Sequence, residues 1–348
     1  MQGSKQETGR ENMTKDGIEN RIPFLLKPVG KDYLWGGSRL NDDFSKGIPM
    51  SPLAETWECS THPDGECLIS GGPFDKMTLR RVLREHPELC GEHGCVDGEL
   101  PVMVKLIDAN RDLSVQVHPT DEYAREHENG QRGKTEMWYV LDTTGDAALV
   151  YGMKTDATRE QIKKAVDGGE LEKYLLRVPI KKNDVFFIEA GMIHAIGAGA
   201  LVAEVQENSN LTYRLYDYKR EDKDGKLRPL HIDKALDVAK LKKQEAPRQP
   251  MRVLKYAPGM ARELLCRCRY FEVYRMLINT ERCRQMAGYE GDELSYRILL
   301  CVDGCGSIRM PEGEAICFFK GDCVFIPAGC RAFRLHGRAV FLDIRGGQ

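Results

Sequence analysis

The sequence predicts a mainly β protein with two jelly-roll barrels and helical insertions. Short runs rich in β-branched and aromatic residues alternate with polar turns, as in VMVKLIDA, LSVQVHP, EMWYVLD and AALVYGM. Such runs are typical of antiparallel strands, and their spacing suits a barrel or jelly roll. Helical spacing occurs in only a few segments, and one strand motif occurs twice.

Two helical insertions interrupt the strands. Residues 75–89 (DKMTLRRVLREHPEL) place Leu79, Val82 and Leu83 on one helical face, and residues 160–176 repeat this character. A further helical segment, HIDKALDVAKLKKQ, lies later in the chain. The rest of the chain is expected to be strands and turns.

The repeated strand motif indicates two related barrels. Residues 183–197 (NDVFFIEAGMIHAIG) and 321–335 (GDCVFIPAGCRAFRL) share a polar turn, an Asp, an apolar strand and an Ala-Gly pair. The third residue after that glycine is His194 in the first copy and Ala332 in the second. The second barrel therefore lacks a side chain that could bind a metal.

The domain organisation follows from this repeat. We expect residues 1–20 to form a flexible tail, because they carry three apolar side chains among many polar ones. An N-terminal barrel domain with the helical insertions and the metal site should span residues 21–241. A charged, proline-bearing linker at 242–255 then leads to a C-terminal barrel domain, 256–348, without metal ligands.

The composition is that of an ordinary globular protein. Apolar residues make up 41% of the 348 residues, charged residues make up 30%, and the net charge is -2, which fits neither a disordered chain nor a membrane protein. No long stripe of Lys and Arg is present, so we expect no nucleic-acid partner. No run approaches the roughly 20 apolar residues that a membrane span needs, so we expect no membrane partner. An acidic small substrate remains compatible with a local pair of basic residues.

The twelve cysteines are expected to be reduced, because the first residues, MQGSKQETGRENMTKDG, contain no apolar signal segment. We therefore expect a cytoplasmic protein. Cys266 with Cys268, and Cys301 with Cys305, lack a paired CxxC partner at structural-zinc spacing. These four residues are predicted to be core thiols in strands.

Four residues of the first barrel predict a metal site. Gln116 and His118 are two residues apart in a predicted strand, so their side chains point to the same face. Glu136 follows eighteen residues later, and His194 fifty-eight residues after that. Closure of the barrel would bring together two imidazoles, a carboxylate and an amide, which suit Zn²⁺ and leave a position for substrate. Each residue alone has an ordinary structural explanation, and only the joint pattern favours a metal.

Other motifs carry little functional signal. The remaining histidines lack such a setting and are expected to be surface or structural residues: His62, His86, His93, His127, His231 and His336. The chain has no GxxxxGK[ST] loop, no GxGxxG fingerprint and no GxSxG elbow, so neither a nucleotide cofactor nor an acyl-transfer nucleophile is expected.

Three blocks of the chain resemble the short bacterial, class I type of mannose-6-phosphate isomerase: LIDANRDLSVQVHPTDEYA, GKTEMWYVL and FIEAGMIHAIGAGALVAEVQENSNLTYRLYDY. The resemblance covers about residues 21 to 346. It implies a pair of cupin barrels with one Zn²⁺ per chain in the first barrel, held by Gln116, His118, Glu136 and His194. Asn183 and Glu189 stand where the second cupin motif usually has glycine and proline.

The resemblance also implies an activity, the interconversion of mannose 6-phosphate and fructose 6-phosphate through a cis-enediol or enediolate. Such a reaction needs a base that moves a proton between carbons 2 and 1. We assign this role to Glu204, which shares a strand face with Val202 and Gln206, although Glu207 is a competitor. Arg214 is assigned to the phosphate or the enediolate.

Two lysines and a serine complete the predicted site. Lys105 lies inside the apolar strand PVMVKLIDA, where an unpaired ammonium would be costly, and is predicted to face the pocket as a catalytic residue. Lys134 and Ser114 each lie two residues before a proposed ligand and are predicted to bind substrate, with Lys134 holding the phosphate. Structural or solvated roles for both lysines stay open.

Two other function classes are compatible with the same residues. Two histidines and a glutamate also form the facial triad of iron-dependent cupin oxygenases, and a cupin that binds sugars without catalysis would keep the pocket. The sequence leaves open the oligomeric state, the breadth of sugar-phosphate specificity and the role of the second barrel. It also leaves open whether Glu204 or a metal-bound water is the base.

Overall fold

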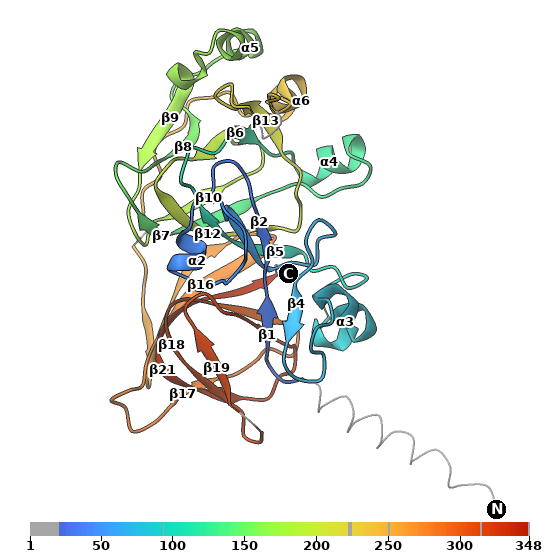
Figure 1. The fold of residues 1–348 in the computed structure, drawn as a ribbon, viewed down its shortest axis with the longest axis vertical. Helices are drawn as coiled ribbons and strands as arrows, with labels where there is room; N and C mark the ends of the chain where they lie inside the picture. The colour runs from blue at the N-terminus through green and yellow to red at the C-terminus, as the bar shows by residue number, and fades with distance from the viewer. Residues whose placement is uncertain (1–20, 93, 222–224, 250, 314, 347–348) are drawn as a thin grey trace, which may run out of the picture.

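The protein is elongated and consists of two β-rich halves stacked along its long axis (Figure 1). The structure is a computed structural model and describes residues 21–346 except 93, 222–224, 250 and 314. The predicted tail at 1–20 lies outside the described residues. Among the described residues, no helix is both long enough and apolar enough to cross a membrane.

The first barrel consists of two antiparallel sheets. The six-stranded sheet has the order β10-β7-β12-β5-β3-β2, and the five-stranded sheet has the order β13-β6-β11-β8-β9. The strands of the first sheet are β2 (Val29–Lys31), β3 (Glu55–Cys59), β5 (Val102–Asp108), β7 (Glu136–Thr143), β10 (Val185–Ile188) and β12 (Ala200–Glu207). The strands of the second are β6 (Val115–Val117), β8 (Ala148–Met153), β9 (Leu175–Pro179), β11 (His194–Ile196) and β13 (Tyr213–Tyr216).

The second barrel is formed by one sheet of ten strands among the described residues. Its C-terminal strands are β14 (Lys255–Ala257), β15 (Met260–Arg267), β16 (Phe271–Asn279), β17 (Ala287–Tyr289), β18 (Arg297–Arg309), β19 (Ile316–Phe319), β20 (Cys323–Ile326) and β21 (Phe333–Gly346). Two strands from the other end of the chain, β1 (Phe24–Lys27) and β4 (Leu68–Ser70), complete it, because β1 pairs with β20. The mainly β, two-barrel fold predicted from the sequence is confirmed.

The two copies of the repeated motif occupy corresponding strands. Its apolar part forms β10 in the first barrel and β20 in the second. His194 begins β11, whereas Ala332 is exposed just before β21. Asn183 has a φ of 74°, a left-handed conformation that asparagine tolerates better than most residues, so the replacement of the usual glycine leaves this turn intact.

The helices are short and lie outside the barrels: α2 (Arg39–Asp42), α3 (Leu79–Glu85), α4 (Asp121–His127), α5 (Arg159–Asp167), α6 (Ile232–Val238) and the 3₁₀ helices η1 (Pro87–Leu89) and η2 (Leu171–Tyr174). A helix is present in each of the three predicted helical segments, as α3, α5 and α6, but each helix is shorter than the segment predicted from the sequence. Pro87 interrupts the first of them, because proline cannot donate to the helix. The short helix α4, capped by the Thr120 side chain, was not predicted.

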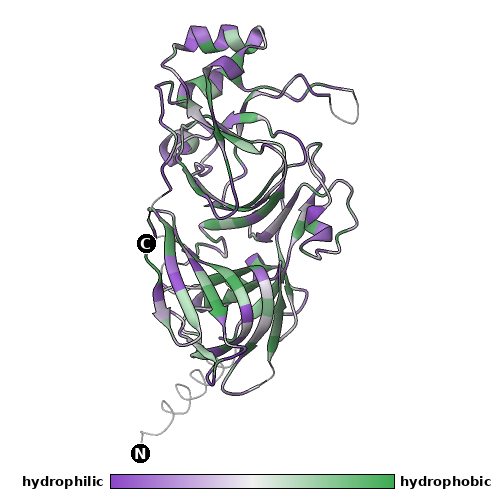
Figure 2. Cartoon of the chain, turned by 90° about the vertical axis from the view of Figure 1, so that its left-hand side faces the viewer, coloured by the Kyte–Doolittle hydropathy of each residue, from purple (hydrophilic) through white to green (hydrophobic). Residues whose placement is uncertain are grey.

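Apolar residues are concentrated on the strands of both barrels (Figure 2). One core cluster fills the first barrel, with Trp138 and Val202, and another fills the second, with Phe318 and Phe341. A larger cluster lies between the halves and joins residues such as Val205 to the C-terminal strands. Strand β12 is therefore buried along its whole length, which fixes the side chains that it points into the first barrel.

Two expectations about cysteines are wrong: that all twelve are reduced, and that Cys266, Cys268, Cys301 and Cys305 are all core thiols, because only Cys301 of these four is buried. Cys90 and Cys95 form a disulfide with a Cα–Cα distance of 5.9 Å, because the turn after η1 brings the two residues within bonding range. The other ten cysteines are free thiols. The pairs Cys266 with Cys268 and Cys301 with Cys305 belong to no metal-binding cluster among the described residues.

A buried ion pair connects the halves. Lys46 Nζ donates to Glu58 Oε2 at 2.6 Å and also to the backbone oxygen of Gly321 in the second barrel. Burial raises the pKa of Glu58, and the nearby Lys46 ammonium opposes this rise. This contact and the pairing of β1 with β20 both join N-terminal residues to the C-terminal barrel. The division at residues 242–255 remains a prediction from the sequence.

Replacing Lys46 with methionine is expected to destabilise the protein by about 3 to 5 kcal/mol, because Glu58 would lose its buried partner. Urea denaturation of the wild type, Lys46→Met and Lys46→Met/Glu58→Gln measures the effect. The double variant should recover most of the loss, since it removes the unpaired charge. Equal losses in the single and double variants would contradict this explanation.

Candidate active site and metal centre

A pocket of about 230 Å³ opens between the two sheets of the first barrel. Two rows of cross-strand neighbours face each other there. In the five-stranded sheet, Gln116 pairs with both His194 and Arg214. In the six-stranded sheet, Glu204 pairs with both Lys105 and Trp138. Directly opposite residues on adjacent strands share a face, so strand register brings these side chains to one cavity.

The four predicted metal ligands lie together beside this pocket. His118 Nε2 is 3.1 Å from His194 Nε2 and 3.1 Å from Glu136 Oε1. Gln116 Nε2 lies 3.4 Å from His194 Nε2, and exchange of the nearly identical amide nitrogen and oxygen would present Oε1 instead. One ligand atom from each histidine and from Glu136 lies within 4.8 Å of the others.

The two imidazoles present bare nitrogens to each other. Each Nδ1 bonds to a backbone carbonyl, that of Leu211 at 2.9 Å for His118 and that of Met192 at 2.8 Å for His194. A carbonyl only accepts, so each Nδ1 carries the proton and each Nε2 has a lone pair. Burial lowers the pKa of both rings, that of His118 to about 3 with help from the Lys134 ammonium. Both histidines are therefore neutral, as metal ligation requires.

Glu136 is the third deprotonated group that could bind a metal. Burial alone would raise its pKa, but Lys134 and His118 lower the pKa well below the ordinary value, so the carboxylate is charged. Neither of its fully buried oxygens has a well-formed hydrogen bond, although Lys134 Nζ is 2.5 Å from Oε1. Lys134 contacts Glu136 Oε1 and His118 Nε2, which leaves Glu136 Oε2 and His194 Nε2 facing each other at 3.9 Å. Two such lone pairs turned toward one point favour a further cation there. The residues therefore fit a divalent metal ion.

The predicted base and the predicted catalytic lysine are adjacent. Glu204 Oε2 accepts from Trp138 Nε1 at 2.9 Å, and its Oε1 is 3.5 Å from Lys105 Nζ. Burial raises the pKa of Glu204, and the Glu136 carboxylate acts in the same direction. The competitor Glu207 instead accepts from the Thr135 backbone N–H at 2.8 Å and does not line the pocket.

Glu55 is a pocket residue that the sequence analysis missed. Its Oε2 accepts from Trp57 Nε1 at 2.8 Å and lies 3.7 Å from Lys105 Nζ. Burial lowers the pKa of Lys105, but Glu55 and Glu204 outweigh this effect and raise it, so the lysine stays an ammonium. Its segment, ETWEC, is no apolar run like the one around Lys105, and its burial in β3 follows from tertiary packing.

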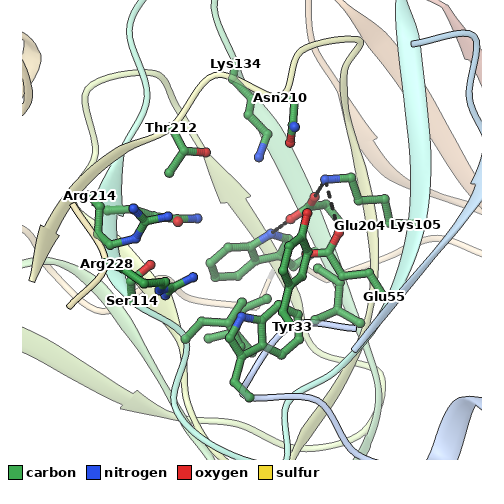
Figure 3. A pocket seen from close by; sticks show the side chains of 16 residues that line it. Tyr33, Glu55, Lys105, Ser114, Lys134, Glu204, Asn210, Thr212, Arg214 and Arg228 are labelled. Carbon is green, nitrogen blue, oxygen red and sulfur yellow. Dashed lines mark hydrogen bonds and ion pairs between the residues drawn. The ribbon is translucent and has the colours of Figure 1, made fainter. Parts of the chain in front are cut away.

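The remaining predicted residues also line the pocket. Ser114 and Arg214 lie on one side, and Lys134 projects from above (Figure 3). Further lining residues were not predicted: Tyr33, Trp35, Asn210, Thr212 and Arg228. They lie in loops, where no spacing rule distinguishes them. The functional roles of all these residues stay predictions.

The other described histidines take no part in the metal cluster. His231 Nδ1 accepts from the Arg214 backbone N–H at 3.1 Å, and His62 Nδ1 accepts from the Asp64 backbone N–H at 3.1 Å. These are structural contacts, as expected for histidines outside the motif. His93 lies outside the described residues.

Removing the metal should destabilise the wild type but not a variant that cannot bind it. A divalent metal at about 100 times its Kd would stabilise the folded state by about 2.7 kcal/mol, whereas Glu136→Gln should gain far less. Melting curves of chelated protein with and without added metal measure this difference. His127→Asn, at an exposed histidine, should respond like the wild type. An equal shift in Glu136→Gln would refute the proposed cluster.

Comparison with known proteins places the chain in a family. Residues 23–142 match the family described as phosphomannose isomerase type I, catalytic domain. A mannose-6-phosphate isomerase of Bacillus subtilis is 37% identical over 91% of this chain and 96% of its own length. The enzyme of that name from Streptococcus mutans is 32% identical over 90% and 95%, respectively.

A solved structure extends the similarity to the whole fold. The crystal structure of mannose 6-phosphate isomerase from Bacillus subtilis superposes with a TM-score of 0.84 at 33% sequence identity. It covers 93% of this chain and 99% of its own. Sequence and fold agree over nearly the full length of both proteins, and the chain belongs to the mannose-6-phosphate isomerase family of type I.

Proposed function

We propose that this protein is a zinc-dependent isomerase that interconverts mannose 6-phosphate and fructose 6-phosphate in the cytoplasm through a cis-enediolate. The observation that carries the proposal is the buried cluster of two neutral imidazoles and a charged carboxylate beside a pocket lined by Glu204, Lys105 and Arg214. Ten free thiols suit a reducing compartment.

Zinc is the metal that suits this donor set best. Imidazole nitrogens and a carboxylate are ligands that Zn²⁺ accepts in catalytic sites, with one ion per chain expected here. When bound, Zn²⁺ supplies a fixed positive charge and no redox chemistry, which suits a reaction that moves a proton between neighbouring carbons.

Glu204 is the proposed base that takes the proton from carbon 2 and returns it to carbon 1. The Trp138 bond holds one carboxylate oxygen and leaves the other toward Lys105 and the pocket. Its raised pKa makes it a stronger base than an exposed glutamate. A base whose pKa approaches the working pH transfers protons most efficiently in both directions.

Lys105 is proposed to stabilise negative charge rather than to accept protons. Its ammonium is held between Glu55 and Glu204, and it stays charged because both carboxylates raise its pKa. A fixed cation beside the reacting carbons favours the enediolate over the neutral sugar. Glu55 would keep this ammonium in place while Glu204 changes its protonation state.

Lys134 and Ser114 are proposed to bind the substrate. Lys134 Nζ contacts both Glu136 Oε1 at 2.5 Å and His118 Nε2 at 3.4 Å, so its charge is tied to the metal end of the pocket. We therefore assign Lys134 to substrate oxygens near the reacting carbons, in place of the phosphate role expected from the sequence. Ser114, nearly buried on the opposite wall, would donate its hydroxyl to the substrate.

The function is tested by incubating the zinc-loaded protein with mannose 6-phosphate in deuterated water. The wild type should form fructose 6-phosphate and incorporate deuterium, and complete chelation should stop both. Iron dependence with oxygen consumption would instead favour an oxygenase, and binding without label exchange would favour a sugar-binding cupin. Either outcome would overturn the proposed activity.

Glu204→Gln should lower kcat on the order of a hundredfold to ten-thousandfold, because the amide cannot act as a base. The KM should change far less, since the shape of the pocket is kept. Glu207→Gln is the matched comparison and should retain most of the activity. If Glu207→Gln were the variant that lost proton exchange, the base would be wrongly assigned.

A further inference from the structure

We propose that Arg228, held in place by Asp217, forms with Arg214 the part of the pocket that binds the phosphate group of the substrate. This inference rests on the proposed function, which requires a sugar phosphate. Arg228 lines the pocket although it lies in the segment after β13, far along the chain from the metal ligands.

Asp217 fixes the Arg228 guanidinium through two parallel hydrogen bonds. Arg228 Nε donates to Oδ2 at 2.7 Å, and Nη2 donates to Oδ1 at 2.8 Å. The Asp217 side chain is only 5% exposed and that of Arg228 is 19% exposed. A bidentate pair in such surroundings holds the planar fork in a single orientation. Arg228 is therefore presented to the pocket already ordered.

Arg214 is fixed in the same region by different contacts. Its Nη1 donates to the backbone oxygen of Pro229 at 2.9 Å, the residue after Arg228. Its buried Nε has no hydrogen-bond partner in the described part of the chain. Burial lowers the pKa of Arg214, and the Arg228 charge lowers it further. The structure thus holds two like charges together and leaves one donor unsatisfied.

The charges in this region do not balance. Arg220 also pairs with Asp217, and the Asp217 charge acts on Arg214. Among the described residues, three guanidinium groups therefore lie around the Asp217 carboxylate, an excess of two positive charges in this set. A phosphate monoester carries about -1.5 to -2 at neutral pH. Such a group would offset the excess and offer acceptor oxygens to the unsatisfied Arg214 Nε. The local charge therefore matches a phosphate dianion better than an uncharged sugar.

The other cations of the pocket are already neutralised. Lys105 lies between Glu55 and Glu204, and Lys134 is paired with Glu136. In Figure 3, Arg214 and Arg228 lie on one side with Ser114 and Thr212, whereas Lys105, Glu55 and Glu204 lie on the other. The phosphate would bind at the arginine side, and carbons 1 and 2 would then extend toward Glu204.

Calorimetric titration with inorganic phosphate tests the proposal without relying on catalysis. Arg228→Gln should weaken phosphate binding by about 10-fold to 150-fold, as expected for losing a hydrogen bond to a charged group. The KM for mannose 6-phosphate should rise in parallel, with a smaller change in kcat. Arg228→Lys keeps the positive charge but loses the planar guanidinium that can form two hydrogen bonds at once. It should bind phosphate with intermediate affinity.

Asp217→Asn distinguishes positioning from a simple charge effect. Removing a negative charge beside an anion site would strengthen phosphate binding if Asp217 acted only through its charge. We expect weaker binding instead, because Arg228 would lose its fixed orientation. Tighter binding would refute the positioning role.

Arg159→Gln is the matched control, because Arg159 forms an arginine–aspartate pair with Asp237 on the exposed surface and should leave phosphate binding unchanged. Unchanged phosphate affinity in a folded Arg228→Gln variant, checked by circular dichroism, would overturn the proposal even if the enzyme is active. Conversely, a wild type that binds phosphate in an Arg228-dependent way but does not isomerise the sugar would overturn only the proposed function.

Discussion

The site depends on a buried cluster of two imidazole lone pairs and a carboxylate, in which the Lys134 ammonium contacts Glu136 and His118. The carbonyls of Leu211 and Met192 take the Nδ1 protons of His118 and His194, which turns both Nε2 lone pairs toward the Glu136 carboxylate. Burying such a set is costly unless a cation balances it. The strands that carry these residues must therefore hold them against mutual repulsion, and the rest of the fold supplies that rigidity.

The second barrel supports the site mechanically. The large core between the halves buries the outer face of the six-stranded sheet, so the strands that carry Glu204 and Lys105 are packed on both sides. The second barrel itself shows no metal ligands at the repeated motif, where Ala332 replaces the histidine. Polar groups elsewhere in it pair internally, as where the fully buried Asp343 meets Arg262 and Arg297.

The pocket combines two different electrostatic environments. At one end, Glu136, Glu204 and Glu55 surround two lysines and the metal position, where carboxylate charge is available to bind a cation and to move a proton. At the proposed phosphate end, arginines outnumber their single carboxylate partner. A substrate with a dianionic group at one end and reactive hydroxyl-bearing carbons at the other would be oriented by this difference before any specific contact forms.

The sequence by itself determined the strands, the repeat and the residues that two-residue spacing places on one strand face, such as Gln116 with His118. It did so because side-chain direction along a strand is a local property. Only the tertiary structure decided that β1 joins the C-terminal barrel, that Cys90 meets Cys95, and that Glu55 and Arg228 reach the pocket. The barrel and pocket contacts depend on strand pairing and loop paths between residues distant in the chain, and the Cys90–Cys95 bond depends on the turn after η1. No residue spacing in the sequence specifies either.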